Sequence, residues 1–298
     1  MPALPRFLLP LLGLCAALAA APAAATLRVF VSVPPLAPLA QRVGGPTVEV
    51  RTLVGQNQDP HSFEPSARQV QALAAAEVFW AVGMPYERAW LPRLRAANPD
   101  LRVVDARTAL GLPPLGQAAG PAHAPHGHGH AHDHDPAADP HLWTSPRAVR
   151  AMVEPLAEAF AAADPANGPA YRANATALDA ELAALDAEVR AALAPLRARR
   201  FVVFHPAWGQ FAADYGLEQI AIEQAGKEPT ARALAALATR LRAEGVRVVF
   251  VQPQTGRRSA ETLAREIGAR LALLDPMAAD PVQGTRDLVR ALTEAQAP

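Results

Sequence analysis

Apolar and polar residues follow one regular pattern from Asp164 to Leu196. Its apolar residues recur at steps of three and four with acidic residues mostly between them, which is the period of a helix with one buried face. The apolar positions are Tyr171, Ala175, Leu178, Leu182, Leu185, Val189, Leu193 and Leu196. Asp164 or Asn167 can cap its start, and Pro169 suits its first turn. We therefore predict one helix of roughly 40 Å, long enough to brace two lobes.

Short apolar runs on both sides of this helix predict β-strands. They cover 26–33, 48–54, 77–82 and 101–105 before the helix, and 200–204, 217–222, 246–251 and 269–274 after it. Helical patterns lie between the strands or follow them, at 65–76, 86–97, 208–215, 230–243, 259–267 and 281–295. Strands that alternate with helices predict parallel sheets. The sequence thus predicts an α/β fold with two four-stranded, Rossmann-like lobes joined by a long rigid helix.

The first 25 residues have the layout of a secretory signal peptide, with one arginine, an apolar core and an alanine-rich end. The apolar core is short for a membrane span of roughly 20 residues, so we expect export to the periplasm with cleavage after Ala25. The expected organisation is a signal peptide (1–25), a first lobe (26–163), the linking helix (164–197) and a second lobe (198–298). Since Cys15 is the only cysteine and leaves with the signal, disulfides and thiolate metal sites are excluded.

Charge and histidine content refine this picture. The 28 basic and 28 acidic residues balance, which gives no reason to expect nucleic-acid binding. The segment 111–139 is rich in Gly, Pro and Ala and has no apolar period, so it predicts a disordered loop. The loop contains His123, His126, His128, His130, His132 and His134. This composition suits weak, exchangeable metal capture, and an inert solubilising spacer is the alternative.

The three remaining histidines each lie beside a proline at a junction. His61 and His141 stand in DPH sequences, and His205 stands in FHP directly after a predicted strand. Asp275 also follows a predicted strand, in LLDP. All four would lie beyond the carboxyl ends of parallel strands, where open α/β sheets bind ligands, with two from each half. Three imidazoles and one carboxylate suit tetrahedral Zn²⁺, whereas Mn²⁺ prefers more oxygen ligands.

With these residues in place, the chain resembles the zinc and manganese substrate-binding proteins of bacterial ABC importers, the cluster A-I family. The motifs that carry the resemblance are DPHSFEPSARQVQALAAAEVFWAVG (59–83), DPHLWTSP (139–146), FHPAWGQFAADYGL (204–217), VRVVFVQPQ (246–254) and LALLDP (271–276). The resemblance implies two α/β lobes with a metal in the cleft between them, and its ligands fall on His61, His141, His205 and Asp275. Because Pro60 directly precedes the first histidine, Asp59 is expected to support the ligands instead of binding the ion.

The function implied is that of a monomeric, non-enzymatic periplasmic carrier that binds Zn²⁺ tightly and delivers it to an inner-membrane ABC permease. A periplasmic metallochaperone is a further candidate partner. We expect release by movement of one ligand loop, and weaker binding below roughly pH 6 as the histidines become protonated. Alternatives are a carrier of manganese or another divalent metal, a surface adhesin or metal-storage protein, and a zinc-dependent hydrolase. The hydrolase is disfavoured because Asp275 would close the metal's coordination and no HExxH pattern is present.

Overall fold

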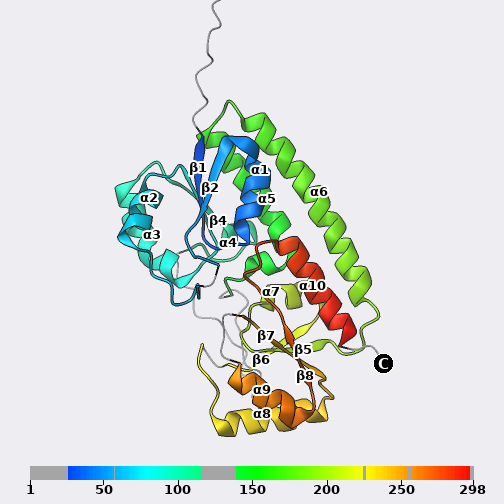
Figure 1. Ribbon diagram of the computed structural model, residues 1–298. Coiled ribbons are helices and arrows are strands. Elements are labelled where there is room, and N and C mark those ends of the chain that lie inside the picture. Colours follow the sequence, from blue (N-terminus) through cyan, green and yellow to red (C-terminus); the bar gives the residue numbers. More distant parts are fainter. Residues whose placement is uncertain (1–25, 57, 116–138, 224–225, 254–256, 296–298) are drawn as a thin grey trace, which may run out of the picture.

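The computed structural model of the protein contains two parallel β-sheets (Figure 1). It describes residues 26–56, 58–115, 139–223, 226–253 and 257–295. The first sheet comprises β1 (Leu27–Val31), β2 (Val48–Thr52), β3 (Val78–Ala81) and β4 (Arg102–Asp105), in the order β2-β1-β3-β4. The second comprises β5 (Arg200–Val203), β6 (Glu218–Ala221), β7 (Val248–Val251) and β8 (Arg270–Leu273), in the order β6-β5-β7-β8. The predicted pair of four-stranded parallel sheets is confirmed, and we call the parts built on them the first and second lobes.

The inner strands explain why the sheets form where they do. Every residue of β3 and β7 is buried, as expected for parallel strands covered on both faces. In the first sheet Val29 of β1 pairs with Val78, and in the second Val202 of β5 pairs with Val249. Because all pairs are parallel, the carboxyl ends of the strands in each sheet share one edge.

Helices connect the strands largely as the sequence predicts. The predicted ones are α2 (Ala67–Ala74), α3 (Pro85–Ala97), α7 (Gly209–Tyr215), α8 (Ala231–Ala243), α9 (Arg258–Ile267) and α10 (Pro281–Glu294). Those that the pattern did not indicate are α1 (Leu36–Gly44), α4 (Ala106–Ala109), α5 (Pro146–Ala163) and the 3₁₀ turns η1 (Gly45–Thr47) and η3 (Leu142–Thr144). The long helix α5 was not predicted, although its buried residues recur at helical spacing and Pro155 lies at an exposed position among them.

The predicted linking helix is present as α6 (Gly168–Leu193), which runs along one side of the molecule from the first lobe towards the second (Figure 1). Asn167 occupies its N-cap, whereas Asp164 ends α5 and accepts hydrogen bonds from the Asn167 and Tyr171 side chains. At the other end, the Arg199 guanidinium donates to the carbonyl of Leu193 at 3.2 Å, as expected for a basic residue at a helix C-terminus.

Ion pairs join the helix α6 to both lobes. Arg42 of α1 pairs with Glu181, and Arg286 of α10 pairs with Glu188 at 3.0 Å. The helix α6 therefore contacts elements of both lobes, although each of these ion pairs is exposed and contributes little by itself.

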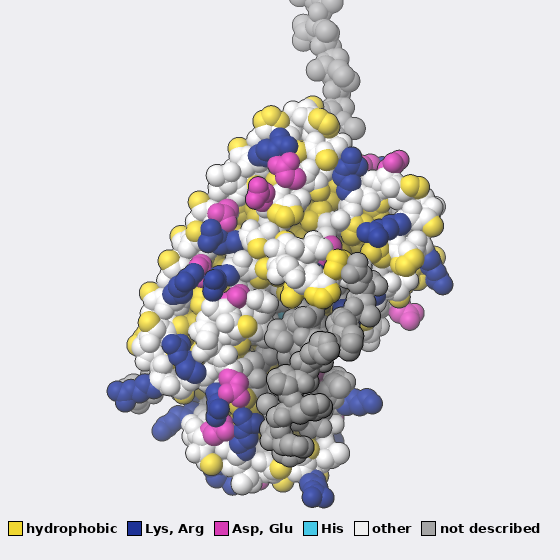
Figure 2. All heavy atoms as spheres, turned by 180° about the vertical axis from the view of Figure 1, so that it is seen from behind, with side chains coloured by type: hydrophobic (Ala, Val, Ile, Leu, Met, Phe, Trp, Pro, Cys, Tyr) yellow, Lys and Arg dark blue, Asp and Glu magenta, His cyan; other side chains and the backbone are white. Residues whose placement is uncertain are grey.

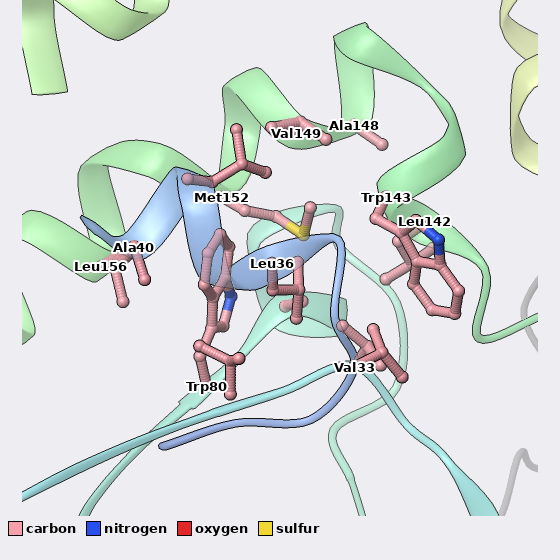
Figure 3. Packing of buried hydrophobic residues seen from close by; sticks show 14 of the residues in the cluster. Val33, Leu36, Ala40, Trp80, Leu142, Trp143, Ala148, Val149, Met152 and Leu156 are labelled. Atoms are coloured by element: carbon pink, nitrogen blue, oxygen red, sulfur yellow. The ribbon is translucent and has the colours of Figure 1, made fainter. Parts of the chain in front are cut away.

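A single hydrophobic core also crosses that boundary. Figure 3 shows its centre, where Leu36 of α1, Trp80 of β3 and Met152 of α5 pack together. The same cluster of buried side chains includes Phe250 of β7 and Leu288 of α10, so it continues into the second lobe. A smaller cluster lies under α8 and α9 on the other face of the second sheet. Because the lobes share a core, a wide rotation of one against the other would expose apolar surface and is disfavoured.

The surface is charged but mixed. Basic and acidic side chains are interspersed over the face seen in Figure 2, in keeping with the balanced composition. Among the described helices, none has the length and apolar character needed to cross a membrane. The first residues of the predicted loop 111–139 are tied to α4, since Arg107 donates to the Pro113 carbonyl at 2.9 Å and Leu115 N–H donates to Asp105 at 2.5 Å. The predicted signal peptide (1–25) and residues 116–138 of the predicted loop lie outside the described residues.

The packing of α6 gives a first prediction. Leu182 is only 2% exposed, so Leu182→Ala should lower the free energy of unfolding of the metal-free protein by about 2–5 kcal/mol, measured by urea denaturation. Thr176→Ala, at an exposed position of the same helix, is the matched control and should change it by less than about 0.5 kcal/mol. Equal, small effects of both substitutions would contradict the role of α6 as a packed strut.

Candidate metal centre

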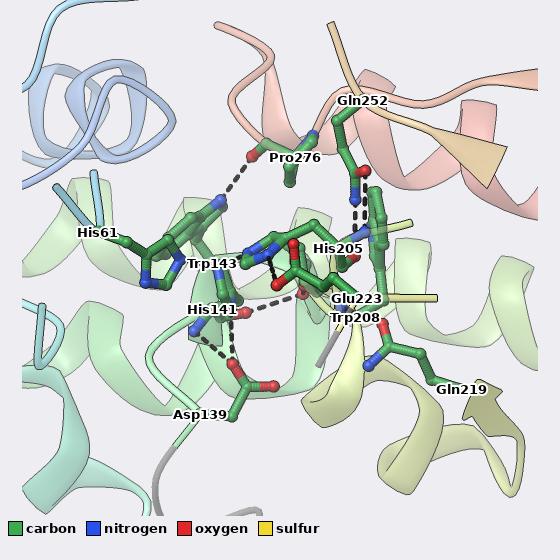
Figure 4. A network of polar contacts seen from close by, with 12 residues as sticks. His61, Asp139, His141, Trp143, His205, Trp208, Gln219, Glu223, Gln252 and Pro276 are labelled. Carbon is green, nitrogen blue, oxygen red and sulfur yellow. Dashed lines mark hydrogen bonds and ion pairs between the residues drawn. The ribbon is translucent and has the colours of Figure 1, made fainter. Parts of the chain in front are cut away.

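Three histidines from both lobes meet at one point (Figure 4). His61 lies in the loop between β2 and α2, His141 directly precedes η3, and His205 follows β5. The Nε2 atom of His141 is 3.1 Å from Nε2 of His61 and 3.2 Å from Nε2 of His205. The candidate ligand atoms of all three lie within 4.8 Å of one another, close enough for a single ion to contact each. The structure thus brings together the three histidines that the sequence singled out.

The two DPH sequences form the same local turn. The Asp59 carboxylate accepts the backbone N–H of His61 at 2.9 Å, and the Asp139 carboxylate accepts that of His141 at 2.9 Å. Since the intervening proline has no N–H, the carboxylate reaches the next free donor, which closes an Asx turn. The aspartate thus holds the backbone of His61 and of His141 independently of the contacts that their side chains make.

Carboxylates also hold two of the imidazole rings. Asp139 Oδ1 is 2.7 Å from Nδ1 of His141, and Glu223 Oε1 is 2.8 Å from Nδ1 of His205. When the carboxylate accepts from Nδ1–H, the lone pair of the ring lies on Nε2, which faces the other histidines. Burial alone would raise the pKa of Asp139, but its interactions with His141 lower it below the ordinary value. These carboxylates would also partly offset the charge of a divalent ion.

His61 is poised to bind without releasing a proton. Burial, followed by the charges of His141 and His205, lowers the pKa of His61 to about 4. Its imidazole is therefore neutral at pH 7, which is the form that coordinates a metal. Its ring centroid lies 4.8 Å from that of His205 and 5.1 Å from that of His141.

The fourth predicted ligand is not part of this group. Asp275 follows β8, but its carboxylate is not among the atoms that lie within 4.8 Å of one another. Its Oδ1 accepts the backbone N–H of Met277 at 2.9 Å, and the residue borders a hollow of about 220 Å³ together with Trp143 and Trp208. Coordination by Asp275 stays a prediction. The six histidines of the predicted loop, His123 to His134, lie outside the described residues.

Asp139 and Glu223 were not identified from the sequence. Asp139 stands in the same place before His141 as Asp59 does before His61, so the repeated DPH sequence could have indicated it. Glu223 comes shortly after β6, whose carboxyl end lies beside that of β5 in the second sheet. The topology of the sheet, which the sequence alone does not give, is what brings Glu223 to His205.

The fold and the site together define a two-lobed α/β protein with a three-histidine candidate metal centre where the lobes meet. Residues 29–295 match the family model described as the periplasmic component A of the zinc-uptake complex, ZnuA. The chain belongs to this family.

Several relatives agree with this assignment. A protein of Treponema pallidum (strain Nichols), whose name describes it as metal-binding, is 32% identical over 253 residues, covering 84% of this chain and 79% of that protein. The zinc-binding lipoprotein AdcA of Streptococcus pneumoniae serotype 4 is 27% identical over 84% of this chain, which spans only 50% of AdcA. A crystal structure of ZnuA superposes with a TM-score of 0.79 at 35% identity, covering 91% of this chain and 100% of that one. A zinc-bound deletion mutant of ZnuA gives 0.78 at 37% identity, with 92% and 99% covered.

A close approach between the lobes gives a second prediction. A Cβ added at Gly209, the first residue of α7, would lie 2.5 Å from Oδ2 of Asp139, so an alanine there would require this carboxylate to shift. Gly209→Ala should push Asp139 away from His141 and weaken zinc binding by about 10-fold or more, measured by chelator competition. In the control Gly284→Ala, the added Cβ would lie no closer than 3.7 Å to its neighbour, and affinity should stay unchanged. Unchanged affinity in Gly209→Ala would show that Asp139 does not orient His141.

The pKa of His61 gives a third prediction. In the unfolded chain, a histidine takes up a proton as the pH falls below about 6.5. In the folded state, His61 stays neutral until the pH falls to about 4. The metal-free protein should therefore lose stability as the pH falls from about 6.5 to 4, by about 3 kcal/mol from this group alone. Denaturation at several pH values, in chelator, should give a smaller loss over this window for His61→Gln than for the unsubstituted protein. If stability fell equally with pH in both proteins, the lowered pKa of His61 would be contradicted.

Proposed function

We propose that this protein is the zinc-binding component of a zinc importer and that His61, His141 and His205 hold the ion during transport. The observation that carries the proposal is the convergence of their ligand atoms within 4.8 Å at the lobe junction. Membership of the zinc-uptake family supports zinc as the cargo, as do relatives named as zinc-binding. A neighbour whose structure is titled as zinc-bound gives further support.

The chemistry of the site favours zinc over harder ions. Three neutral imidazoles supply nitrogen ligands at roughly 2.0–2.1 Å, and Asp275 or a water molecule completes a tetrahedral set. Manganese prefers oxygen ligands, whereas the three imidazoles supply nitrogen. Asp139 and Glu223 strengthen the donation of His141 and His205 by accepting from the opposite ring nitrogen.

The cellular setting follows from the family. We propose that the chain works outside the cytoplasm, after removal of its first 25 residues, as a periplasmic monomer. It would deliver zinc to the membrane permease and ATPase of an ABC importer, and a periplasmic metallochaperone is a candidate donor. The shared core and the strut α6 resist wide opening, so release would proceed by displacement of a ligand loop.

The six histidines of segment 111–139 have a separate, auxiliary role in this proposal. They would capture zinc weakly and raise its local concentration, because a histidine-rich, low-complexity sequence offers exchangeable sites. The cleft site would then bind the ion tightly.

Competitive titration tests the proposal directly. His205→Ala removes one of three nitrogen ligands and should weaken zinc binding by more than about 100-fold. The titration should use protein lacking residues 121–135, so that the loop histidines do not compete, and should include manganese as a second ion. Thr239→Ala, at an exposed position of α8 in the same lobe, should leave the affinity unchanged. Undiminished zinc binding in His205→Ala, or tighter binding of manganese than of zinc by the unsubstituted protein, would overturn the proposal.

A further inference from the structure

One short turn of the first lobe is hydrogen-bonded to two segments of the second lobe. In η3, the indole N–H of Trp143 donates to the carbonyl of Pro276 at 2.6 Å (Figure 4). The neighbouring Thr144 hydroxyl lies 2.8 Å from the carbonyl of His141 and 3.1 Å from that of Ala207. The turn thus reaches the segment after β8 and the segment after His205.

Trp143 joins two parts of the candidate metal centre. Its ring packs against the imidazole of His141, with the centroids 5.3 Å apart, while its N–H holds the residue that follows Asp275. The side chain is only 2% exposed, so water competes little for this hydrogen bond. One indole therefore links the Asp275–Pro276 segment to His141 across the lobe boundary.

This hydrogen bond also limits the oxygen atoms available to a cation. The Pro276 carbonyl accepts from Trp143, and Asp275 Oδ1 accepts from Met277 N–H in the turn that follows β8. Because these hydrogen bonds fix the segment, bringing several of its oxygens to one ion would require breaking them, whereas a single Asp275 oxygen can still complete a tetrahedral set. The arrangement leaves nitrogen as the main donor type that the site presents.

We propose that Trp143 is a positioning residue that determines metal selectivity: by holding the Asp275–Pro276 segment, it prevents extra oxygen ligands from reaching the ion. This inference rests on the proposed zinc-binding function and deepens it. Zinc is satisfied by three imidazoles and one further ligand, so it gains little from additional oxygens. Manganese prefers oxygen donors and higher coordination, so release of the segment favours it.

The test compares two substitutions of the same kind. Trp143→Phe keeps an aromatic ring against His141 but removes the N–H donor. Trp208→Phe is the matched control, because Trp208 is 3% exposed and borders the same hollow. Within the described part of the chain, its indole makes no hydrogen bond, and only its backbone N–H donates to a side chain, that of Gln219. Zinc and manganese affinities would be measured by chelator competition, and the visible absorption spectrum of the cobalt(II) complex would report coordination number.

We expect Trp143→Phe to reduce the ratio of zinc to manganese affinity by about fivefold to tenfold, mainly through tighter manganese binding. Its cobalt spectrum should shift from the intense bands of a four-coordinate ion towards the weaker bands of a higher coordination number. Trp208→Phe should retain the ratio within about twofold and keep the original spectrum.

Two results would overturn the inference. One is an unchanged affinity ratio and cobalt spectrum in Trp143→Phe. The other is an equal loss of affinity for both metals with a lower melting temperature, which would mean that Trp143 only stabilises the fold. In either case the unsubstituted protein would still bind zinc, whereas failure of the proposed function would appear as absent zinc binding before any substitution.

Discussion

The metal centre depends on one constraint, which is that three imidazoles from loops of two lobes must keep their Nε2 atoms within a few ångströms of each other. The Nε2 atom of His141 lies 3.1 Å from that of His61 and 3.2 Å from that of His205. At this spacing, positively charged rings would repel one another. Burial and repulsion from the neighbouring histidines therefore favour a neutral His61 in the metal-free protein, as its lowered pKa indicates. The fold must supply the rigidity that keeps such a group together before an ion arrives.

That rigidity comes from contacts that cross the lobe boundary. The core continues from the first lobe to Phe250 and Leu288 of the second, and α6 is bonded to α1 and α10. Near the site, Ser145 at the start of α5 donates to Asp214 of α7 at 2.5 Å, and Gly209 allows α7 to approach Asp139. The three histidines are thus positioned by an interface between two lobes that share one core.

The sequence predicted the parts of this structure that follow from local pattern. Eight apolar runs predicted the strands, the three-and-four spacing predicted α6, and prolines beside His61, His141 and His205 marked the candidate ligands. It did not predict α5, although the apolar spacing that includes Met152 and Phe160 continues on both sides of Pro155. Nor did it identify Glu223, which reaches His205 only because β6 and β5 are neighbours. The order of strands in a sheet decides a contact of this kind, and a local spacing in the sequence does not give that order.

X-ray absorption at the zinc edge, on protein loaded with one equivalent of zinc, tests the central claim most directly. The account predicts a four-coordinate ion with bonds of roughly 2.0–2.1 Å and the scattering of three imidazoles. The same spectrum should be obtained when residues 121–135 are deleted, because the loop histidines do not form the tight site. A six-coordinate, oxygen-rich spectrum, or fewer than three imidazoles in the deletion protein, would contradict it.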